Sequence, residues 1–321
     1  MRILVVYSDS PKWMKMHWMV NALRSCGNDV LETHDAAGLQ KHEADVDCVL
    51  FQHKGVIRWA TLKDIAAKRT AIWVQVWFDL IALDPKVSLV KQHLFERNAD
   101  ILREMDLVFV KEHSLLKEYW AAGVRAVWLD QGVPATIASM RSDDIDRRVK
   151  CDVLLWGQGR PHYSSRHADV EALIDKGYSV QWIDGRNTRA KCLPRAKPED
   201  LVQQGFSSRA MLAVGRRNDV AGYVSDAYWL AVATGRPVLK RNECIGTPGL
   251  CLAYQDRCEL LSKMAWVVDN PDLSSELGRN AKQWLIDHNT MELNAERLVR
   301  CVTELARSSR KKDRKTVAVS V

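Results

Sequence analysis

The chain alternates short apolar, β-branched runs with segments of helical periodicity, and this alternation is the strongest constraint on its fold. The strand-like runs of the first half lie at residues 2–8, 29–33, 46–53, 71–79, 105–112 and 125–134. Apolar residues at helical spacing occupy residues 11–27, 58–69 and 114–123. Near-continuous apolar strands are typical of a parallel sheet covered on both faces. We therefore expect an open, mostly parallel α/β sheet.

The same plan recurs after a polar interval at residues 134–149, which we interpret as a domain boundary. Strands are expected at 151–157, 178–184, 209–215 and 236–241, with a helix at 165–177 and helices from residue 258 onward. The predicted domains are residues 1–140 and 151–290, with the helix 291–309 packing back on the first and a basic tail at 307–321. Two Rossmann-like domains of this kind are expected to face each other across a cleft at the carboxyl ends of their strands.

Missing motifs argue against a nicotinamide or flavin enzyme, a kinase and an ATPase. Neither domain has GxGxxG after its first strand, and the P-loop spacing GxxxxGK[ST] is absent. The 8 cysteines include no CxxC pair, so we expect reduced, structural thiols and no metal site. No run of about 18 apolar residues occurs, which favours a cytoplasmic protein without a membrane span.

The net charge of +7 is a thin argument for a nucleic-acid partner, because most of it lies at the end of the chain. The stretch RSSRKKDRK at 307–315 carries six cations and one aspartate, which leaves about +2 on the rest of the chain. This tail either contacts phosphates or is a solvated end, and composition does not decide between the two.

The segment 222–241, GYVSDAYWLAVATGRPVLKR, places a polar start before a short apolar helix and a Gly235 turn behind it. Ser225 or Asp226 is positioned to cap this helix. The free N–H groups and partial positive charge of such a helix start suit a pyrophosphate. The alternative is an ordinary capped helix that binds nothing.

Four passages resemble the GT-B glycosyltransferases, specifically the group-1-like branch. They are VYSDSPKWMKMHWMVNALRSCGNDV, MDLVFVKEHSLLKEYWAAGVRAVWLDQGVP, CDVLLWGQGR and GYVSDAYWLAVATGRPVL, the last similar to the donor segment SDRLFEALACGTPVL. The resemblance implies the GT-B fold of two Rossmann-like domains and a nucleotide-sugar co-substrate, with UDP-sugars favoured, and neither a tightly bound cofactor nor a catalytic metal. The chain departs from the family at Ala227 and at Leu230, where the family has a ribose-binding Glu. Tyr223, Tyr228 or Asp226 is available to replace that Glu.

The donor site has to stabilise charge on a departing diphosphate. Cations at strand ends and glycines that admit a ligand near the backbone serve this purpose. The residues expected there are Gly157, Gly159, Arg160, Arg216, Tyr223, Ser225 and Asp226, the alternative for the arginines being a solvated surface position. Lys240 and Arg241 are expected to be surface charges.

An inverting transfer also needs a base near the acceptor hydroxyl. Asp79 ends the fourth strand and is one candidate, and His53 after the third strand is the rival; for each the alternative is a locally bonded loop residue. Lys12, Trp13 and His17 follow the first strand and are expected to bind the acceptor. Cations interleaved with aromatic residues suit a phosphate backbone with a stacked or flipped base, and they suit a sugar ring as well.

We interpret the chain as a glycosyltransferase, with a hydroxymethylated pyrimidine base in double-stranded DNA as the best single acceptor, as in the phage-type base glycosyltransferases. The alternatives within the class are polysaccharide, lipid-linked and protein acceptors. A GT-B protein that binds a nucleotide or nucleic acid without catalysis is the alternative from another class.

Overall fold

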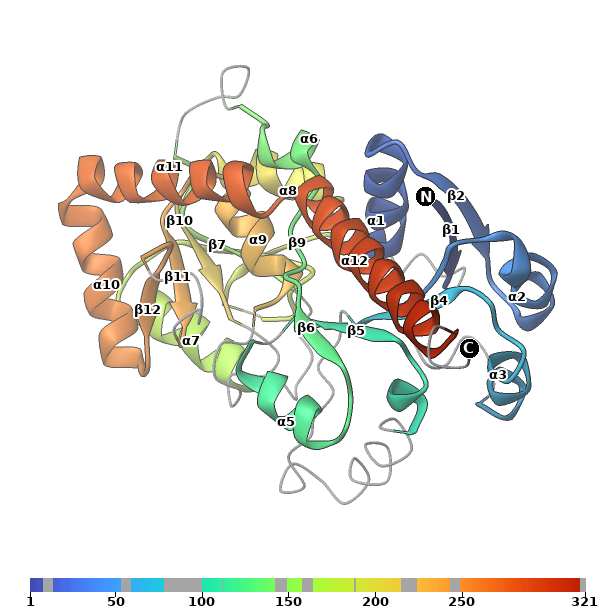
Figure 1. Cartoon of the computed structure of the whole chain (residues 1–321). Coiled ribbons are helices and arrows are strands. Elements are labelled where there is room, and N and C mark those ends of the chain that lie inside the picture. The colour runs from blue at the N-terminus through green and yellow to red at the C-terminus, as the bar shows by residue number, and fades with distance from the viewer. Residues whose placement is uncertain are drawn as a thin grey trace. The chain divides into compact units, whose positions relative to one another are not determined.

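The computed structural model of the chain describes residues 1–7, 14–52, 59–77, 100–111, 113–141, 149–157, 164–187, 189–214, 224–242 and 249–317. The chain divides into two compact units, each with its own sheet (Figure 1). Unit 1 comprises Met1–Asp130 and Met291–Val321, and unit 2 comprises Gln131–Thr290. The beginning of the chain and its last helix therefore belong to the same unit.

Within the described residues, unit 1 contains a sheet of six parallel strands in the order β2-β1-β3-β4-β5-β6. The strands are β1 (Arg2–Val6), β2 (Asp29–Thr33), β3 (Cys48–Phe51), β4 (Ile72–Trp77), β5 (Leu107–Val110) and β6 (Ala126–Trp128). Every residue of β3 and β5 is buried, because helices cover both faces of the sheet. The parallel sheet confirms the α/β class that the alternating sequence predicts.

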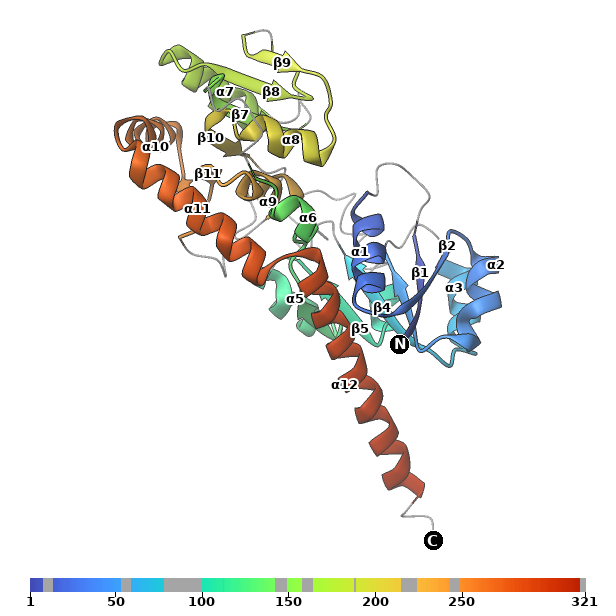
Figure 2. The same ribbon diagram turned by 90° about the horizontal axis from the view of Figure 1, so that it is seen from above.

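The helices of unit 1 lie on the two faces of this sheet (Figure 2). One face carries α1 (Met14–Ser25) and α12 (Met291–Val317), and the other carries α2 (Ala36–His42), α3 (Trp59–Ala66) and α5 (Leu116–Ala121). Short turns, η2 (Glu43–Asp45) and η4 (His113–Leu115), complete the connections. Four apolar residues of α12 at helical spacing enter the core: Met291, Ala295, Leu298 and Val302.

Unit 2 repeats the plan with a second six-stranded parallel sheet, in the order β12-β11-β10-β7-β8-β9. Its described strands are β7 (Cys151–Trp156), β8 (Val180–Ile183), β9 (Lys191–Leu193), β10 (Ser208–Ala213), β11 (Val238–Arg241) and β12 (Leu252–Tyr254). The chain runs from β7 to β8 and β9 on one side, and from β10 to β11 and β12 on the other. The adjacent strands β7 and β10 therefore form a topological switch point.

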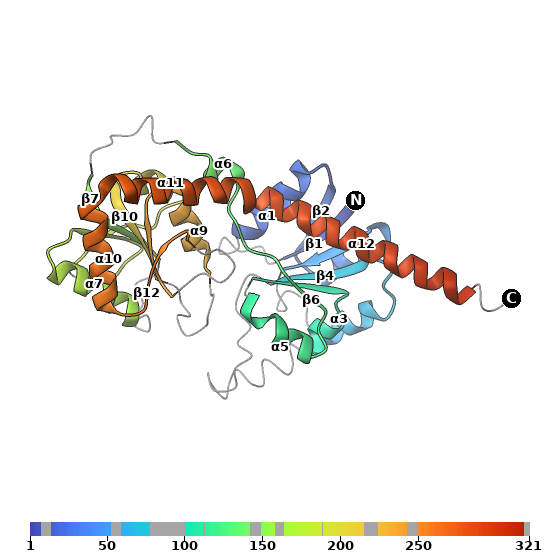
Figure 3. The ribbon, with the colours of Figure 1, turned by 60° about the vertical axis from the view of Figure 1, so that its left-hand side comes forward.

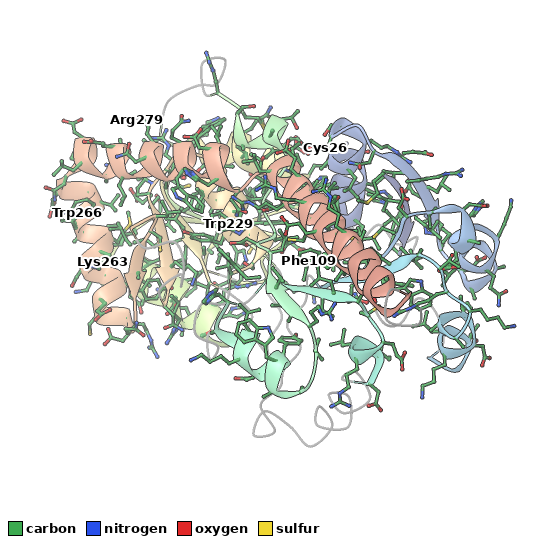
Figure 4. The ribbon with its side chains drawn as sticks, viewed as in Figure 1. Cys26, Phe109, Trp229, Lys263, Trp266 and Arg279 are labelled. Carbon is green, nitrogen blue, oxygen red and sulfur yellow. The ribbon has the colours of Figure 1, made fainter. Side chains whose placement is uncertain are left out.

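Helices again cover both faces of the sheet in unit 2 (Figure 3). The core on one face includes α7 (Ser164–Asp175) and α10 (Arg257–Asp269). A second group of helices packs together: α6 (Ala135–Ala138), α8 (Pro198–Gly205), α9 (Asp226–Ala233) and α11 (Pro271–His288). Trp229 of α9 (labelled in Figure 4) is fully buried. Its ring stacks on that of Trp284 in α11, with centroids 5.9 Å apart. Gly278 lets α11 approach the turn after α9, since an added Cβ would lie 2.3 Å from the carbonyl oxygen of Gly235.

Candidate functional site

The carboxyl ends of three neighbouring strands meet at one edge of the sheet in unit 2. Leu155 of β7 pairs with Leu212 of β10, and Ala213 of β10 pairs with Lys240 of β11. Extending this register by one or two residues places three residues side by side across the carboxyl edge of the sheet: Gly157, Val214 and Arg241. Open α/β sheets bind ligands at this edge, beside the switch point.

Gly157 and the buried Arg166 form one part of this edge. Gly157 has φ 135°, and a Cβ added there would lie 2.8 Å from Nη1 of Arg166. Arg166, in the first turn of α7, donates from Nη2 to the carbonyl oxygen of Val214 at 2.7 Å. Trp182 donates from Nε1 to the carbonyl oxygen of Gly157 at 2.7 Å. Only glycine satisfies both the positive backbone angle and the close guanidinium of Arg166. The predicted contact of Gly157 with the donor stays a prediction.

Arg241 is held at the same edge by a buried carboxylate. Nη1 of Arg241 lies 3.2 Å and 3.3 Å from the two carboxyl oxygens of Asp169, which is fully buried in α7. Tyr254 donates its hydroxyl to Asp169 at 2.8 Å. Burial raises the pKa of Asp169, although the hydrogen bonds from Tyr254 and Arg241 oppose this. The expectation that Arg241 is a surface charge is wrong, because its side chain is anchored and only 25% exposed.

Lys240 also contradicts the sequence-based expectation. It points to the opposite face of the sheet from Arg241, as alternating residues of a strand do, and only 5% of its surface is exposed. Its Nζ donates to the carbonyl oxygens of Arg241 at 3.2 Å and Asn242 at 2.9 Å. It also lies 6.0 Å from the centroid of the Tyr228 ring. Asn242 has a positive φ of 65°, so Lys240 secures a strained turn directly behind β11.

The helix α9 begins at this edge with the residues that the sequence singled out. Ser225 is at the N-cap position with extended backbone angles, and its side chain makes no capping hydrogen bond. Leu230, at the position of the family's Glu, is fully buried. Tyr228 is buried too, with its ring against that of Trp229 at 4.8 Å between centroids. The position of the usual ribose contact is therefore part of the core in this protein.

Many of the predicted site residues lie outside the described residues. They are Lys12, Trp13, His53, Asp79, Gly159, Arg160, Arg216 and Tyr223, together with the side chain of Asp226. The described structure therefore places Gly157 and Ser225 in unit 2 and His17 in unit 1.

In unit 1, His17 belongs to a chain of polar contacts at the carboxyl end of β1. The Tyr7 hydroxyl lies 3.3 Å from Nδ1 of His17 and donates to Oε2 of Glu32. Arg24 of α1 pairs with Oε1 of Glu32 at 2.6 Å. Burial alone would raise the pKa of Glu32, but the hydrogen bonds from Tyr7 and Arg24 and the charges of Arg24 and His17 lower it overall. His17 itself is exposed at the start of α1.

A second polar residue lies at the carboxyl edge of the sheet in unit 1. Gln52, directly after β3, is 3% exposed, and neither its side-chain oxygen nor its nitrogen has a hydrogen-bond partner in the described part of the chain. An unpaired buried amide costs about 1–3 kcal/mol. Its position at the ligand-binding edge of the sheet is consistent with a polar ligand there.

Other features of the described residues set limits on the site. They include no group of three or more His, Cys, Asp or Glu side chains arranged to hold a metal ion. None of the helices in the described ranges combines the length and the apolar character needed to cross a membrane. A cavity of about 450 Å³ in unit 2 is lined by residues such as Lys150 and Ser207, which directly precede β7 and β10 at the amino ends of these strands. It lies at the edge opposite Gly157 and Arg241, where sheets of this type do not usually bind their ligands.

Comparison with known proteins identifies the fold. No protein-family model and no curated protein sequence matches the chain. The structure of Anabaena HepE (Alr3699) in complex with UDP-glucose superposes with a TM-score of 0.74 at 10% identity, over 95% of this chain and 100% of that chain. The DNA-modifying enzyme β-glucosyltransferase superposes with a TM-score of 0.64 at 12% identity, over 94% and 100%. For α,α-trehalose 6-phosphate synthase from Burkholderia multivorans the values are 0.67 and 10%, over 87% and 74%.

These similarities extend over nearly the whole chain and over both sheets. The protein therefore has the GT-B fold, as its sequence predicted.

The hydrogen-bonded side chains at the carboxyl edges of the two sheets were not predicted from the sequence. Asp169 sits inside a helix, and its partners Arg241 and Tyr254 lie 72 and 85 positions away. Tyr7 directly follows β1 and Glu32 lies in β2, and the sequence pattern of both segments indicates only a core. Lys240 and Arg241 at the end of β11 were the available signal, since two adjacent cations in an otherwise apolar strand end are unusual.

Proposed function

We propose that the protein is a glycosyltransferase that takes a sugar from a nucleotide-sugar donor, with UDP-sugars favoured. The observation that carries this proposal is the GT-B architecture, shared over almost the whole chain with structures that contain UDP or UDP-glucose. The carboxyl edge of unit 2 supports it, because it gathers Gly157, the start of α9 and the anchored Arg241. A guanidinium fixed by a buried carboxylate is preorganised for a diphosphate.

The donor site of the proposal extends into residues outside the described ranges. Gly159, Arg160, Arg216 and Tyr223 complete it, together with Ser225 and Asp226 at the start of α9. The donor is held without the family's ribose-binding Glu, because Leu230 is in the core. Lys12, Trp13 and His17 contact the acceptor, and Asp79 and His53 are the sequence-based candidates for the base that takes its proton.

For the acceptor we propose a hydroxymethyl-type pyrimidine in double-stranded DNA. Two features support it: the fold is shared with a DNA-modifying β-glucosyltransferase, and the last turns of α12, which carry the basic stretch, extend past the rest of unit 1 (Figure 2). A polysaccharide, lipid-linked or protein acceptor is the competing choice. We also propose that the protein works in the cytoplasm, of the host cell if its source is a phage. The seven described cysteines are free, as is usual in a reducing compartment.

A thermal-shift panel tests the donor and the acceptor in one experiment. The ligands are UDP, GDP, dTDP, CMP and their sugars, each with and without duplex DNA that contains hydroxymethylated cytosine or uracil. A ligand that binds only the folded protein adds about 2.7 kcal/mol at 100 times its dissociation constant. Stabilisation by a UDP-sugar, increased by the modified duplex, is the expected result. A panel without any shift contradicts the proposed function, and a donor shift that modified DNA does not change contradicts the DNA acceptor.

A further inference from the structure

The hydrogen bonds of Tyr7, at the carboxyl end of β1, determine which nitrogen of neutral His17 has no proton. The Tyr7 hydroxyl has a single proton, and it donates that proton to Glu32. Glu32 is an acceptor only, since its pKa is lowered and Arg24 pairs with its other oxygen at 2.6 Å. At 3.3 Å the Tyr7 oxygen must therefore accept from Nδ1–H of His17. In neutral His17 the proton is on Nδ1, and Nε2 has the free lone pair.

A second histidine touches the same tyrosine and provides a comparison. Nδ1 of His34 lies 2.9 Å from the backbone carbonyl oxygen of Tyr7, which can only accept, so His34 has the same tautomer. The two rings flank the Tyr7 ring edge-on, with centroids 5.3 Å away for His17 and 4.7 Å for His34. Only His17 is connected through the hydroxyl to a carboxylate. A carboxylate behind an imidazole orients it and stabilises the imidazolium once a proton has been taken.

We propose that His17 is the general base of the transfer reaction, and that Tyr7 and Glu32 are its positioning residues. Nε2 of His17 takes the proton from the acceptor hydroxyl while the oxygen forms a bond to the anomeric carbon of the sugar. The bond from that carbon to the diphosphate breaks, and its electron pair leaves with the nucleoside diphosphate. This inference rests on the proposed function, and it gives His17 the role that the sequence assigned to Asp79 or His53.

The test compares His17→Asn with His34→Asn in the full-length protein. Asparagine retains an amide N–H near the position of Nδ1, so each variant can keep its bond to Tyr7 and lacks only a basic nitrogen. The assay measures UDP release from UDP-glucose, with water alone and with a duplex that contains 5-hydroxymethylcytosine, and UDP binding is measured separately by calorimetry. Loss of a general base lowers a rate by about 10²–10⁴-fold. We expect a decrease of that size in kcat for His17→Asn, with unchanged UDP affinity, and a nearly normal rate for His34→Asn.

Tyr7→Phe and Glu32→Gln test the positioning role. Each should lower kcat and leave KM for UDP-glucose unchanged, and the double variant should be no slower than the slower single variant, because the two residues act through one chain. Independent, multiplied losses would contradict a common chain.

The outcomes separate this inference from the function on which it rests. A wild-type protein that binds no UDP, or binds it and never releases UDP from UDP-glucose, overturns the proposed transferase and the base together. A wild-type protein that is active, with His17→Asn equally active, overturns only the base. Equal losses in His17→Asn and His34→Asn also overturn it, since they would reflect damage around Tyr7 and not the loss of one nitrogen.

Discussion

Replacing Asp169 by Asn tests whether the buried carboxylate holds the ligand-binding edge of unit 2 together. The variant keeps the side-chain volume and removes the charge that accepts from Tyr254 at 2.8 Å and Arg241 at 3.2 Å. A hydrogen bond to a charged group contributes about 1.5–3 kcal/mol, and breaking a buried ion pair costs about 3–5 kcal/mol. Two effects reduce the cost: the Arg241 side chain is 25% exposed and can be hydrated, and burial already disfavours the charged carboxylate. We therefore expect a loss of about 2 kcal/mol.

The assay is thermal unfolding of the full chain, followed by tryptophan fluorescence. A loss of about 2 kcal/mol corresponds to a decrease in Tm of roughly 4–8 °C for a domain of the size of unit 2. Asp175→Asn is the matched control on the same helix, since Asp175 pairs with Arg189 at 2.6 Å while both side chains are about half exposed. Exposed pairs contribute about 0–1 kcal/mol. Equal decreases in Tm for the two variants, or none for Asp169→Asn, would refute the reasoning.

Three further substitutions have defined outcomes. Burial lowers the pKa of Lys282 to about 8 from an ordinary value of 10.5. Between these two pH values the unfolded chain binds more protons than the folded one, so the free energy of unfolding rises with pH. Lys282→Met should abolish that rise in urea titrations at pH 7.5 and 10, and a rise that persists in the variant would assign it to another group. Gly278→Ala places a methyl group 2.3 Å from the carbonyl oxygen of Gly235 and should cost about 1–3 kcal/mol in the same titration, whereas an unchanged midpoint would mean that α11 moves freely. In Gly157→Ala the new methyl group would be strained by the positive φ and would lie close to Nη1 of Arg166. The UDP affinity measured by calorimetry should therefore fall at least about tenfold, which is about 1.4 kcal/mol. An affinity equal to that of the wild type would mean that Gly157 is not part of the site.

The sequence was sufficient for the fold because the elements that define it have strong local patterns. The four buried residues of β3 and the six residues of β4 follow directly from apolar, β-branched runs. The elements missed were short. The edge strands β9 and β12 have three residues each, too few for a period-2 pattern to emerge. The seven-residue helix α2 depends on a cap at Asp35, which accepts from the N–H of Gly38 at 2.8 Å.

The candidate site was predicted less completely, because its organisation depends on contacts between distant residues. Glycines and a helix start can be recognised locally, and the structure puts Gly157 and Ser225 at the expected edge. The pairing of Arg241 with Asp169 brings together a strand end and a helix interior, and no local pattern encodes it. The sequence showed that Leu230 departs from the family, and the structure adds that this position is in the core.

Hydrogen–deuterium exchange with and without UDP is the most direct test of the central claim, that the carboxyl edge of unit 2 binds the nucleotide of the donor. We predict that UDP protects peptides covering residues 157–166 and 224–242, including Gly157, Ser225 and Arg241. Peptides at the amino edge, around Lys150 and Ser207, should exchange as before. Protection confined to the amino edge, or no protection in unit 2, would contradict the account.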